Sequence, residues 1–322
     1  MARRAVVLMN LGGPDSPESV QPFLYNLFSD PAIIRLPALL RLPLARLIAA
    51  RRASIAREIY ARLGGGSPLL ANTEAQAQAL EAALGADYRC FIAMRYWHPL
   101  SEEAVAAVKA WRPEELILLP LYPQFSTTTT ASSVTAWQCE AARQGLGVPT
   151  RLIRSYPAEP GFVAALADVV GNVLQAAEVT GTPVRLLFSA HGLPLKIVRA
   201  GDPYPAEVER SAAAVAAALG RVRLDWRLCY QSRVGPLAWL GPSVEEELRR
   251  AGRDRVAVVV APISFVSEHS ETLVELDRDY RRVAAACGVP AYYRAPTVGI
   301  DPRFIAALAN LVRRAPDDGD AL

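Results

Sequence analysis

The chain contains the same short motif twice, and this repeat constrains its fold more than any other feature of the sequence. Val-Leu-Met-Asn-Leu-Gly-Gly-Pro at residues 7–14 resembles Leu-Phe-Ser-Ala-His-Gly-Leu-Pro at 187–194, with glycine and proline in register 180 positions apart. Leu-Leu-Pro-Leu at 118–121 resembles Val-Ala-Pro-Ile at 260–263, but only 142 positions apart. The spacings differ by 38 residues, which we assign to an insertion at about residues 31–66. The sequence therefore predicts two lobes with one plan.

Short apolar runs alternate with alanine-rich stretches along both halves. The runs predict strands at 5–9, 89–94, 116–120, 185–188, 225–229 and 256–261. The stretches predict helices at 73–84, 101–111, 206–219, 244–250 and 271–286. Strands that alternate with helices indicate an α/β fold with parallel sheets flanked by helices. We predict two similar Rossmann-like lobes, residues 1–150 and 151–300, with a cleft between them and a helix at 301–315 that packs back on the first lobe.

Length, charge and cysteine usage exclude several classes of protein. The 322 residues suffice for two domains, and a net charge of +3 is too small to indicate nucleic-acid binding. The four cysteines form no C-x-x-C pair, so we expect reduced, mostly buried thiols. The apolar run at 5–9 is too short for a signal sequence, and no stretch approaches the ~18 apolar residues of a membrane span. We therefore expect a cytoplasmic protein.

The loops that follow the predicted strands hold all three histidines. In parallel α/β sheets, ligands bind beyond the carboxyl ends of the strands. The residues at these ends are 10–12, 95–98, 122–124, 190–192, 230–233 and 265–271. His98, His191 and His269 belong to this set. Their clustering predicts a metal or proton-transfer site in the cleft between the lobes.

Two groups of side chains could carry that chemistry. His191 sits in a tight Gly-Leu-Pro turn, where it could bind a metal or accept a proton, or could be only a hydrogen-bonded turn residue. Glu271, Glu275 and Asp279 are spaced by four residues, which places them in one acidic row on a helix. Acids at a helix start also favour the helix dipole, but Asp279 lies too far in for that explanation. A row of this kind suits a dication such as iron(II), or a proton relay.

The motifs together resemble those of the ferrochelatases over almost the whole chain. They are Met-Asn-Leu-Gly-Gly-Pro at 9–14, Arg-Leu-Gly-Gly-Gly-Ser-Pro at 62–68, Met-Arg-Tyr-Trp-His-Pro at 94–99, Tyr-Pro-Gln-Phe-Ser at 122–126, Ser-Ala-His-Gly-Leu-Pro at 189–194, Gly-Asp-Pro-Tyr-Pro at 201–205, Gln-Ser-Arg-Val-Gly-Pro-Leu-Ala-Trp-Leu-Gly-Pro at 231–242, and Phe-Val-Ser-Glu-His-Ser-Glu-Thr-Leu-Val-Glu-Leu-Asp at 265–277. The resemblance implies a chelatase-like fold. It also implies an enzyme, a lyase, that inserts ferrous iron into a porphyrin as the last step of haem biosynthesis and releases two protons.

The resemblance also implies roles for the candidate catalytic and metal-binding residues. His191 and Glu271 match the pair at the porphyrin centre, and His269 matches a catalytic support beside them. Glu275 and Asp279 match an acidic path for the metal. Iron is then a substrate and no cofactor is expected. Some relatives hold an iron–sulfur cluster, but this chain has Thr127 at a cluster-cysteine position and no cysteine after Cys287, so we expect no cluster.

The expected porphyrin contacts fall into two groups. Apolar and aromatic walls would bend the flat ring and expose its nitrogens, although such residues also fill ordinary cores. The propionate tails need a cation and hydrogen-bond donors, and the resemblance implies such contacts around the insertion, where the glycines at 64–66 could add a backbone anion nest. The alternative there is a glycine turn that ends a helix. The porphyrin-binding candidates are Leu11, Arg52, Tyr60, Ser67, Arg95, Tyr122, Trp239 and Phe265.

The insertion itself is apolar and basic. Residues 33–63 carry seven arginines against one glutamate, and Pro37 and Pro43 are expected to break the segment into short turns. It is either a helical hairpin that caps the lobe with its arginines reaching solvent, or an amphipathic lip at 31–50 that contacts an anionic membrane. The resemblance favours the lip, with peripheral attachment to the inner face of the membrane. An apolar lip favours protoporphyrin IX over coproporphyrin III as the substrate.

Two other functions fit parts of the pattern. A two-lobed haem carrier would explain the fold but would not need the acidic row. A zinc hydrolase could use His191, His269 and Glu271, but a His-x-Glu pair at a helix start is poor spacing for zinc ligands. An anaerobic assay of metal insertion into porphyrin separates the three functions.

Overall fold

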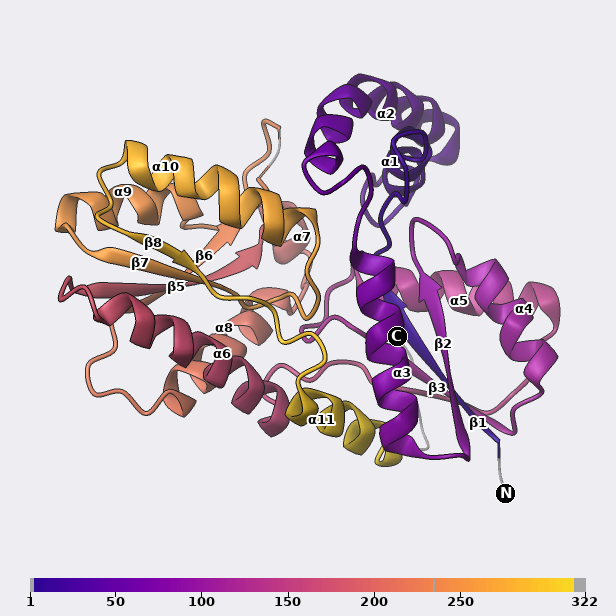
Figure 1. Ribbon diagram of the computed structural model, residues 1–322. Coiled ribbons are helices and arrows are strands. Elements are labelled where there is room, and N and C mark those ends of the chain that lie inside the picture. The colour runs from indigo at the N-terminus through magenta and orange to yellow at the C-terminus, as the bar shows by residue number, and fades with distance from the viewer. Residues whose placement is uncertain (1–2, 234, 316–322) are drawn as a thin grey trace. The chain divides into compact units, whose positions relative to one another are not determined.

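The computed structural model describes residues 3–233 and 235–315. The chain forms two compact units, Met1–Ser155 with Ile305–Leu322, and Tyr156–Phe304. We call them lobe 1 and lobe 2 (Figure 1).

Lobe 1 is built on a parallel sheet of four strands in the order β2-β1-β3-β4. Its strands are β1 (Arg4–Asn10), β2 (Tyr88–Met94), β3 (Glu115–Pro120) and β4 (Thr150–Leu152). Its helices are α1 (Val20–Phe28), α2 (Ala38–Ala61), α3 (Leu69–Leu84), α4 (Ser101–Trp111), α5 (Thr130–Gln144) and most of α11 (Pro302–Arg313). The apolar run in β1 forms the centre of the sheet because the residues from Ala5 to Asn10 are all buried.

Lobe 2 repeats this arrangement with the strand order β6-β5-β7-β8, again all parallel. Its strands are β5 (Val184–His191), β6 (Trp226–Gln231), β7 (Ala257–Pro262) and β8 (Tyr292–Arg294). Its helices are α6 (Pro160–Glu178), α7 (Leu195–Arg199), α8 (Tyr204–Ala218), α9 (Val244–Asp254), the π-helix η1 (Glu271–Asp279) and α10 (Tyr280–Ala286). Two parallel sheets flanked by helices, with the same strand order, confirm the predicted fold class.

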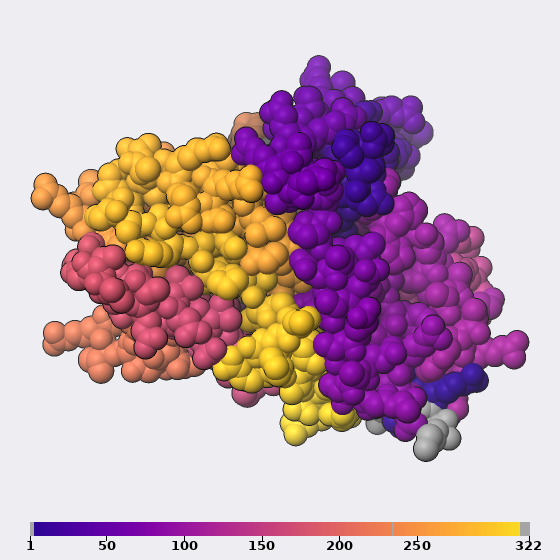
Figure 2. Space-filling view, in the orientation of Figure 1, coloured from indigo at the N-terminus to yellow at the C-terminus, as the bar shows by residue number. Residues whose placement is uncertain are grey.

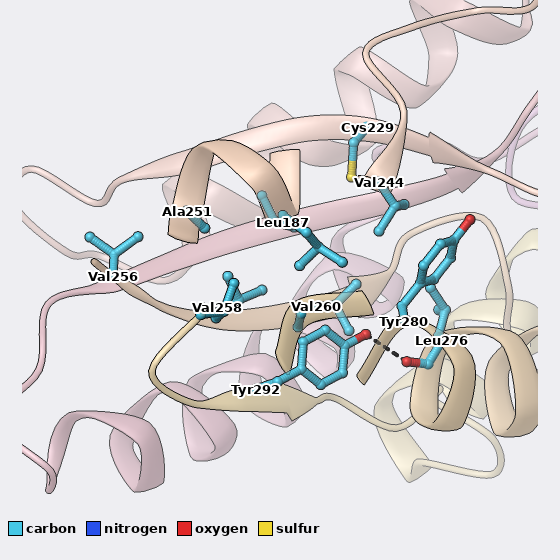
Figure 3. Close-up of a cluster of buried hydrophobic side chains, with 13 residues drawn as sticks. Leu187, Cys229, Val244, Ala251, Val256, Val258, Val260, Leu276, Tyr280 and Tyr292 are labelled. Atoms are coloured by element: carbon cyan, nitrogen blue, oxygen red, sulfur yellow. Dashed lines mark hydrogen bonds between the residues drawn. The ribbon is translucent and has the colours of Figure 1, made fainter. Parts of the chain in front are cut away.

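The core of lobe 2 joins the sheet to the helices that carry the acidic row. Leu187 of β5, Val258 and Val260 of β7, and Leu276 of η1 are fully buried together (Figure 3). The hydroxyl of Tyr292 donates a 2.6 Å hydrogen bond to the carbonyl of Leu276, as the dashed line in Figure 3 shows. This packing fixes η1 against the sheet, at the end where His191 leaves β5.

Within residues 3–233 and 235–315, one helix is long and apolar enough to be considered as a membrane span. This is α6, whose 19 residues have a mean hydropathy of 1.3. Eight of its residues, including Phe162 and Leu166, are buried within the protein, and it packs on β5, β7 and α8. Its apolar character is therefore accounted for by the core of lobe 2.

The structure corrects several of the predicted elements. Strands β4 and β8 were not predicted because each has only three residues, too few to show an alternating pattern. Helices α1, α5, α6 and α7 were also missed. The thiols are free, but only Cys229 is buried, whereas Cys139 is exposed, so the expectation of mostly buried cysteines was wrong.

The expectation that prolines break the insertion into short turns was also wrong. Helix α2 runs unbroken through Pro43 for 24 residues, and Pro37 precedes it as the N-cap. Pro43 lies near the helix start, so it removes one early backbone bond, and packing on α1 supplies the compensating contacts. The insertion thus forms one long helix, α2, which packs on the preceding α1 as a helical hairpin, and the two helices lie side by side in Figure 1.

Residues 271–286 were predicted as one helix, but their first nine form a π-helix. In η1 each backbone N–H bonds five residues back, as the bond from the Tyr280 N–H to the Glu275 carbonyl shows. A π-helix is rare and is frequently found at functional sites. The acidic row therefore lies on a helix with unusual geometry.

Candidate active site

His191 is the last residue of β5 and lies in register with Gln231 at the end of β6. Gly192 follows, and a side chain there would meet the Gln231 carbonyl at 2.7 Å and the ring of Trp239 at 3.4 Å. Glycine is therefore needed for the chain to turn against β6 at this point. The turn leaves the His191 side chain partly exposed, and Trp239 lies beside the following residue, Gly192.

Glu271 holds the imidazole of His191. The Nδ1 atom of His191 lies 2.9 Å from the Oε2 atom of Glu271. An ionised carboxylate only accepts hydrogen bonds, so Nδ1 carries the proton and donates it. This bond leaves Nε2 as the nitrogen available to a substrate.

His269 completes the arrangement around Glu271. Its Nδ1 donates to the carbonyl of Ser267 at 3.1 Å, which fixes the tautomer, because a carbonyl can only accept. Its Nε2 lies 3.9 Å from Glu271 Oε2, and its ring contacts Phe265 with centroids 4.6 Å apart. The structure therefore brings His191, His269, Glu271 and Phe265 together.

Glu271 and His191 perturb each other electrostatically. Burial disfavours the charged form of Glu271, but the charge and hydrogen bond of His191, with a smaller contribution from His269, outweigh it and hold the pKa of Glu271 far below its usual range. Burial would lower the pKa of His191, but the charge and hydrogen bond of Glu271 raise it above its ordinary value. Glu271 is thus ionised at neutral pH, and His191 titrates above its ordinary range.

Glu275 lies one position along the row and is held by four donors. The backbone N–H and hydroxyl of Ser232 donate to it at 2.8 and 2.5 Å. The Gln231 side-chain amide donates at 3.1 Å and the Tyr280 hydroxyl at 3.2 Å. Burial and the neighbouring charge of Glu271 nevertheless raise the pKa of Glu275.

Asp279, the third acid of the row, has different surroundings. Its side chain is 42% exposed and lies 3.4 Å from the guanidinium of Arg282. Asp277 forms the expected surface pair with Arg281 at 2.8 Å. Among the residues that the structure describes, no group of three or more His, Cys, Asp or Glu side chains is arranged as a metal site.

Sequence reasoning missed the residues that support this centre. The hydroxyl of Tyr204 donates to the His191 carbonyl at 3.1 Å and lies 3.0 Å from the hydroxyl of Ser264. No contact between Tyr280 and Glu275 was expected, because an α-helix does not bring residues five apart together whereas a π-helix does. Ser232 has a positive φ of 58°, which no sequence pattern signals.

In lobe 1 the predicted site residues are occupied by internal contacts. Leu11 packs beside the core of the α1–α2 hairpin. The Tyr122 hydroxyl lies 3.4 Å from that of Ser133, and burial raises its pKa. Arg95 forms a 2.8 Å ion pair with the buried carboxylate of Asp30. His98 is paired with Glu103, at 2.7 Å.

The propionate candidates lie at and after α2. Arg52 is exposed, with its guanidinium 5.7 Å from the ring of Phe28, whereas Tyr60 is buried. Ser67 lies against Gly13, where a side chain would meet it at 2.6 Å. The expected nest is largely absent, because the N–H groups of glycines 64 and 65 bond to carbonyls 61 and 60 at the end of α2.

A comparison with models of protein families shows where the chain belongs. Residues 3–315 match the family model described as "Ferrochelatase". The chain belongs to the ferrochelatase family. Ferrochelatases insert iron into a porphyrin in haem biosynthesis and are classed as lyases, and ferrous iron is their substrate.

Individual ferrochelatases agree over nearly the whole length. The chain is 54% identical to the ferrochelatase of Caulobacter vibrioides, across 96% of this chain and 89% of that one. It is 49% identical to the ferrochelatase of a Wolbachia from Drosophila simulans, across 98% and 100%.

Solved structures extend the fold comparison beyond ferrochelatases. The sirohydrochlorin chelatase SirB from Bacillus subtilis subspecies spizizenii, solved with cobalt, has a TM-score of 0.55 at 13% identity, across 97% of this chain and 94% of that one. SirB from Bacillus subtilis with Fe3+ has a TM-score of 0.52 at 15% identity, with the same coverage. These likenesses concern the two-lobed chelatase fold alone.

Proposed function

We propose that this ferrochelatase inserts Fe²⁺ into protoporphyrin IX, with His191 as the base and Glu271 as its partner. The observation that carries this proposal is the 2.9 Å bond from His191 Nδ1 to Glu271, which directs Nε2 to the substrate. A porphyrin releases two pyrrole protons when a metal enters, so a positioned base is required. Nε2 takes a proton, and the carboxylate of Glu271 stabilises the imidazolium that results.

We propose that the acids of η1 serve the metal and the released protons. Glu271 and His191 contact the metal at the porphyrin centre, and His269 holds Glu271 in place. Glu275 is the next acid along the proposed path of the metal, and its donors Ser232, Gln231 and Tyr280 fix the carboxylate. Asp279, which is partly exposed, forms the outer end of the path. Mixed imidazole and carboxylate ligands suit iron(II).

We propose that the predicted wall residues contact the porphyrin. They are Leu11, Tyr122, Trp239 and Phe265. Two contacts support this role, because Trp239 lies beside Gly192, the residue after His191, and the ring of Phe265 contacts that of His269. The propionates are bound by Arg95, Arg52, Tyr60 and Ser67. Arg52 supports this role because its guanidinium is exposed and can reach a carboxylate.

We propose that the hairpin contacts the membrane surface while the enzyme remains cytoplasmic and peripheral. Leu39, Leu40 and Leu47 of α2 are 89%, 61% and 47% exposed. The same segment is strongly basic, and clustered arginines are attracted to anionic lipid. A protein surface of this kind favours the vinyl-bearing protoporphyrin IX over the four-carboxylate coproporphyrin III.

The test is an anaerobic assay with Fe²⁺ and protoporphyrin IX or coproporphyrin III, followed by porphyrin absorbance. We expect insertion with both metal and ring present, and a higher kcat/KM for protoporphyrin IX. A haem carrier would bind the product without turnover, and a zinc hydrolase would leave the porphyrin spectrum unchanged. A higher kcat/KM for coproporphyrin would overturn the substrate assignment. The porphyrin-free protein is expected to lack iron–sulfur absorbance.

The propionate contact has its own test. Arg52→Ala is expected to weaken porphyrin binding by ~1–3 kcal/mol, as for loss of a hydrogen bond to a charged group. The loss should shrink when the propionates are esterified. An equal loss for acid and ester would mean that Arg52 does not bind the propionate.

A further inference from the structure

The α1–α2 hairpin is attached to the rest of lobe 1 through a small region. Helix α2 packs chiefly on α1. Its buried residues Ala45, Ala49 and Ala53 repeat every four positions and let the two helices approach closely. Away from this stripe α2 has exposed leucines, and the violet segment at the top of Figure 2 presents its side chains at the surface. The position of the hairpin therefore depends on contacts near its base.

Asp30, in the turn between α1 and α2, makes the most complete of these contacts. Its side chain is 2% exposed. The Oδ2 atom accepts from Arg95 Nη2 at 2.8 Å, from the Tyr96 hydroxyl at 2.7 Å and from the Ser132 hydroxyl. The Oδ1 atom accepts from the backbone N–H of Ala32 at 2.8 Å. Both carboxylate oxygens are thus occupied.

The donors belong to the part of lobe 1 that carries the sheet. Arg95 and Tyr96 directly follow β2, and Ser132 lies in the first turn of α5. Arg95 also donates to Ser132 at 2.7 Å, and its guanidinium lies 4.9 Å from the ring centre of Tyr96. A buried carboxylate that loses its partner is strongly destabilised, so moving the turn away from these donors would cost considerable free energy.

The same cluster reaches the hairpin through a second bond and through apolar packing. The side-chain amide of Asn26 in α1 donates to the Tyr96 carbonyl at 3.1 Å. The ring of Tyr96 is fully buried in one cluster with Phe23, Ala49 and Tyr60. Tyr96 therefore contacts both helices of the hairpin and Asp30 at once.

We propose that Asp30 is a positioning residue for the porphyrin reaction: its carboxylate latches the α1–α2 hairpin to the loop after β2 and to α5. The latch sets where the hairpin presents its porphyrin-binding side chains, and it holds Arg95 in one orientation. The link to porphyrin rests on the function proposed above, whereas the latch itself rests on the contacts of Asp30 alone.

The latch is tested first on the substrate-free enzyme by amide hydrogen exchange. Asp30→Asn keeps the shape but removes the charge that three donors share. We expect exchange in α1 and α2 to accelerate at least about tenfold, because hydrogen bonds to a charged group are lost, with little change in α4. The control is Arg143→Gln, which breaks exposed ion pairs with Glu102 and Glu140 in the same lobe and should leave exchange in α2 unchanged.

Kinetics then connect the latch to the reaction. Asp30→Asn should raise the porphyrin KM about tenfold, with the KM for Fe²⁺ and kcat within about twofold of the parent, because the hairpin is displaced while His191 is not. Tyr96→Phe and Ser132→Ala each remove one donor and should give smaller effects in the same direction. They keep the proposal testable if Asp30→Asn does not fold.

The outcomes separate the latch from the proposed function. Unchanged exchange in α2, or equal acceleration in α2 and α4, would overturn the latch, since the second result describes only a general loss of stability. Selective acceleration in α2 with an unchanged porphyrin KM would support the latch, and would contradict the porphyrin-binding role proposed for the hairpin.

Discussion

The two lobes share one sheet but differ at the carboxyl ends of their strands. The repeat spacings align Leu11 with His191, and Thr129 and Ser133 with Glu271 and Glu275. Lobe 1 thus has an aliphatic side chain and two hydroxyls where lobe 2 has an imidazole and two carboxylates. The difference shows that the sheet and its helices do not by themselves provide acid–base or metal-binding groups. Those depend on a few side chains at equivalent positions.

The partner of the buried carboxylate also differs between the lobes. Asp30 in lobe 1 is paired with Arg95, which keeps its proton at any physiological pH. Glu271 in lobe 2 is paired with His191, which can gain or lose a proton near neutrality. The first pair suits a fixed attachment and the second suits proton transfer. The helices at equivalent positions also differ between the lobes, because α5 is a regular α-helix whereas η1 is a π-helix.

Among the aligned positions, single alanine substitutions of His191 and Leu11 should differ most in their effect on turnover. His191→Ala should lower kcat by about 10²–10⁴-fold, because it removes the base, while porphyrin binding is retained. Leu11→Ala should act mainly on the porphyrin KM. Measurements of kcat and of porphyrin fluorescence quenching check both. Near-normal turnover in His191→Ala would refute the assignment of the base.

The next contrast is Glu271 against Thr129. Glu271→Gln should reduce turnover by roughly 10–100-fold, because the imidazole loses its charged partner but keeps an acceptor of similar shape. Thr129→Val, its counterpart in lobe 1, should leave turnover unchanged. Single-turnover insertion rates measure both variants. Equal losses would mean that the two lobes contribute chemistry alike.

A smaller effect is expected at the following pair, Glu275 and Ser133. Glu275→Gln should raise the KM for Fe²⁺ by roughly tenfold with a modest change in kcat, because it lies beyond the central pair. Ser133→Ala should leave that KM unchanged. Metal titrations at saturating porphyrin test this. If Glu275→Gln lowered kcat more than Glu271→Gln, the order of roles would be reversed.

The smallest expected effect is a shift in pH dependence. Since Glu271 raises the pKa of His191, the parent's activity should rise with pH through a value above about 6.5, as the imidazole loses its proton. In Glu271→Gln the residual activity should rise at lower pH. An unmoved acid limb would show that another group titrates.

The same pair predicts a window of stability. The raised pKa of His191 contributes stability below about pH 6.5, which is lost as pH rises through the folded value. The lowered pKa of Glu271 contributes above about pH 4.3, and this is lost as pH falls through its folded value. The free energy of unfolding of the parent should therefore exceed that of Glu271→Gln most between these limits.

The sequence by itself determined the repeated α/β plan, the place of the insertion and the residues at the strand ends. These features depend on local patterns, such as the buried run of β1 and the turn at Gly192, which a sequence displays directly. The family motifs added the roles expected for His191 and Glu271. The short edge strands β4 and β8 could not be predicted, because three residues are too few to show an alternating pattern.

Only the tertiary structure decided how these residues are held. It showed α2 continuing through Pro43, because packing on α1 outweighs the local cost of proline. It also showed the π-helix that brings Tyr280 to Glu275, and the cluster that joins Asp30 to side chains 65 to 102 residues away. Such contacts depend on which distant groups meet in the fold, and no local pattern of residues encodes them.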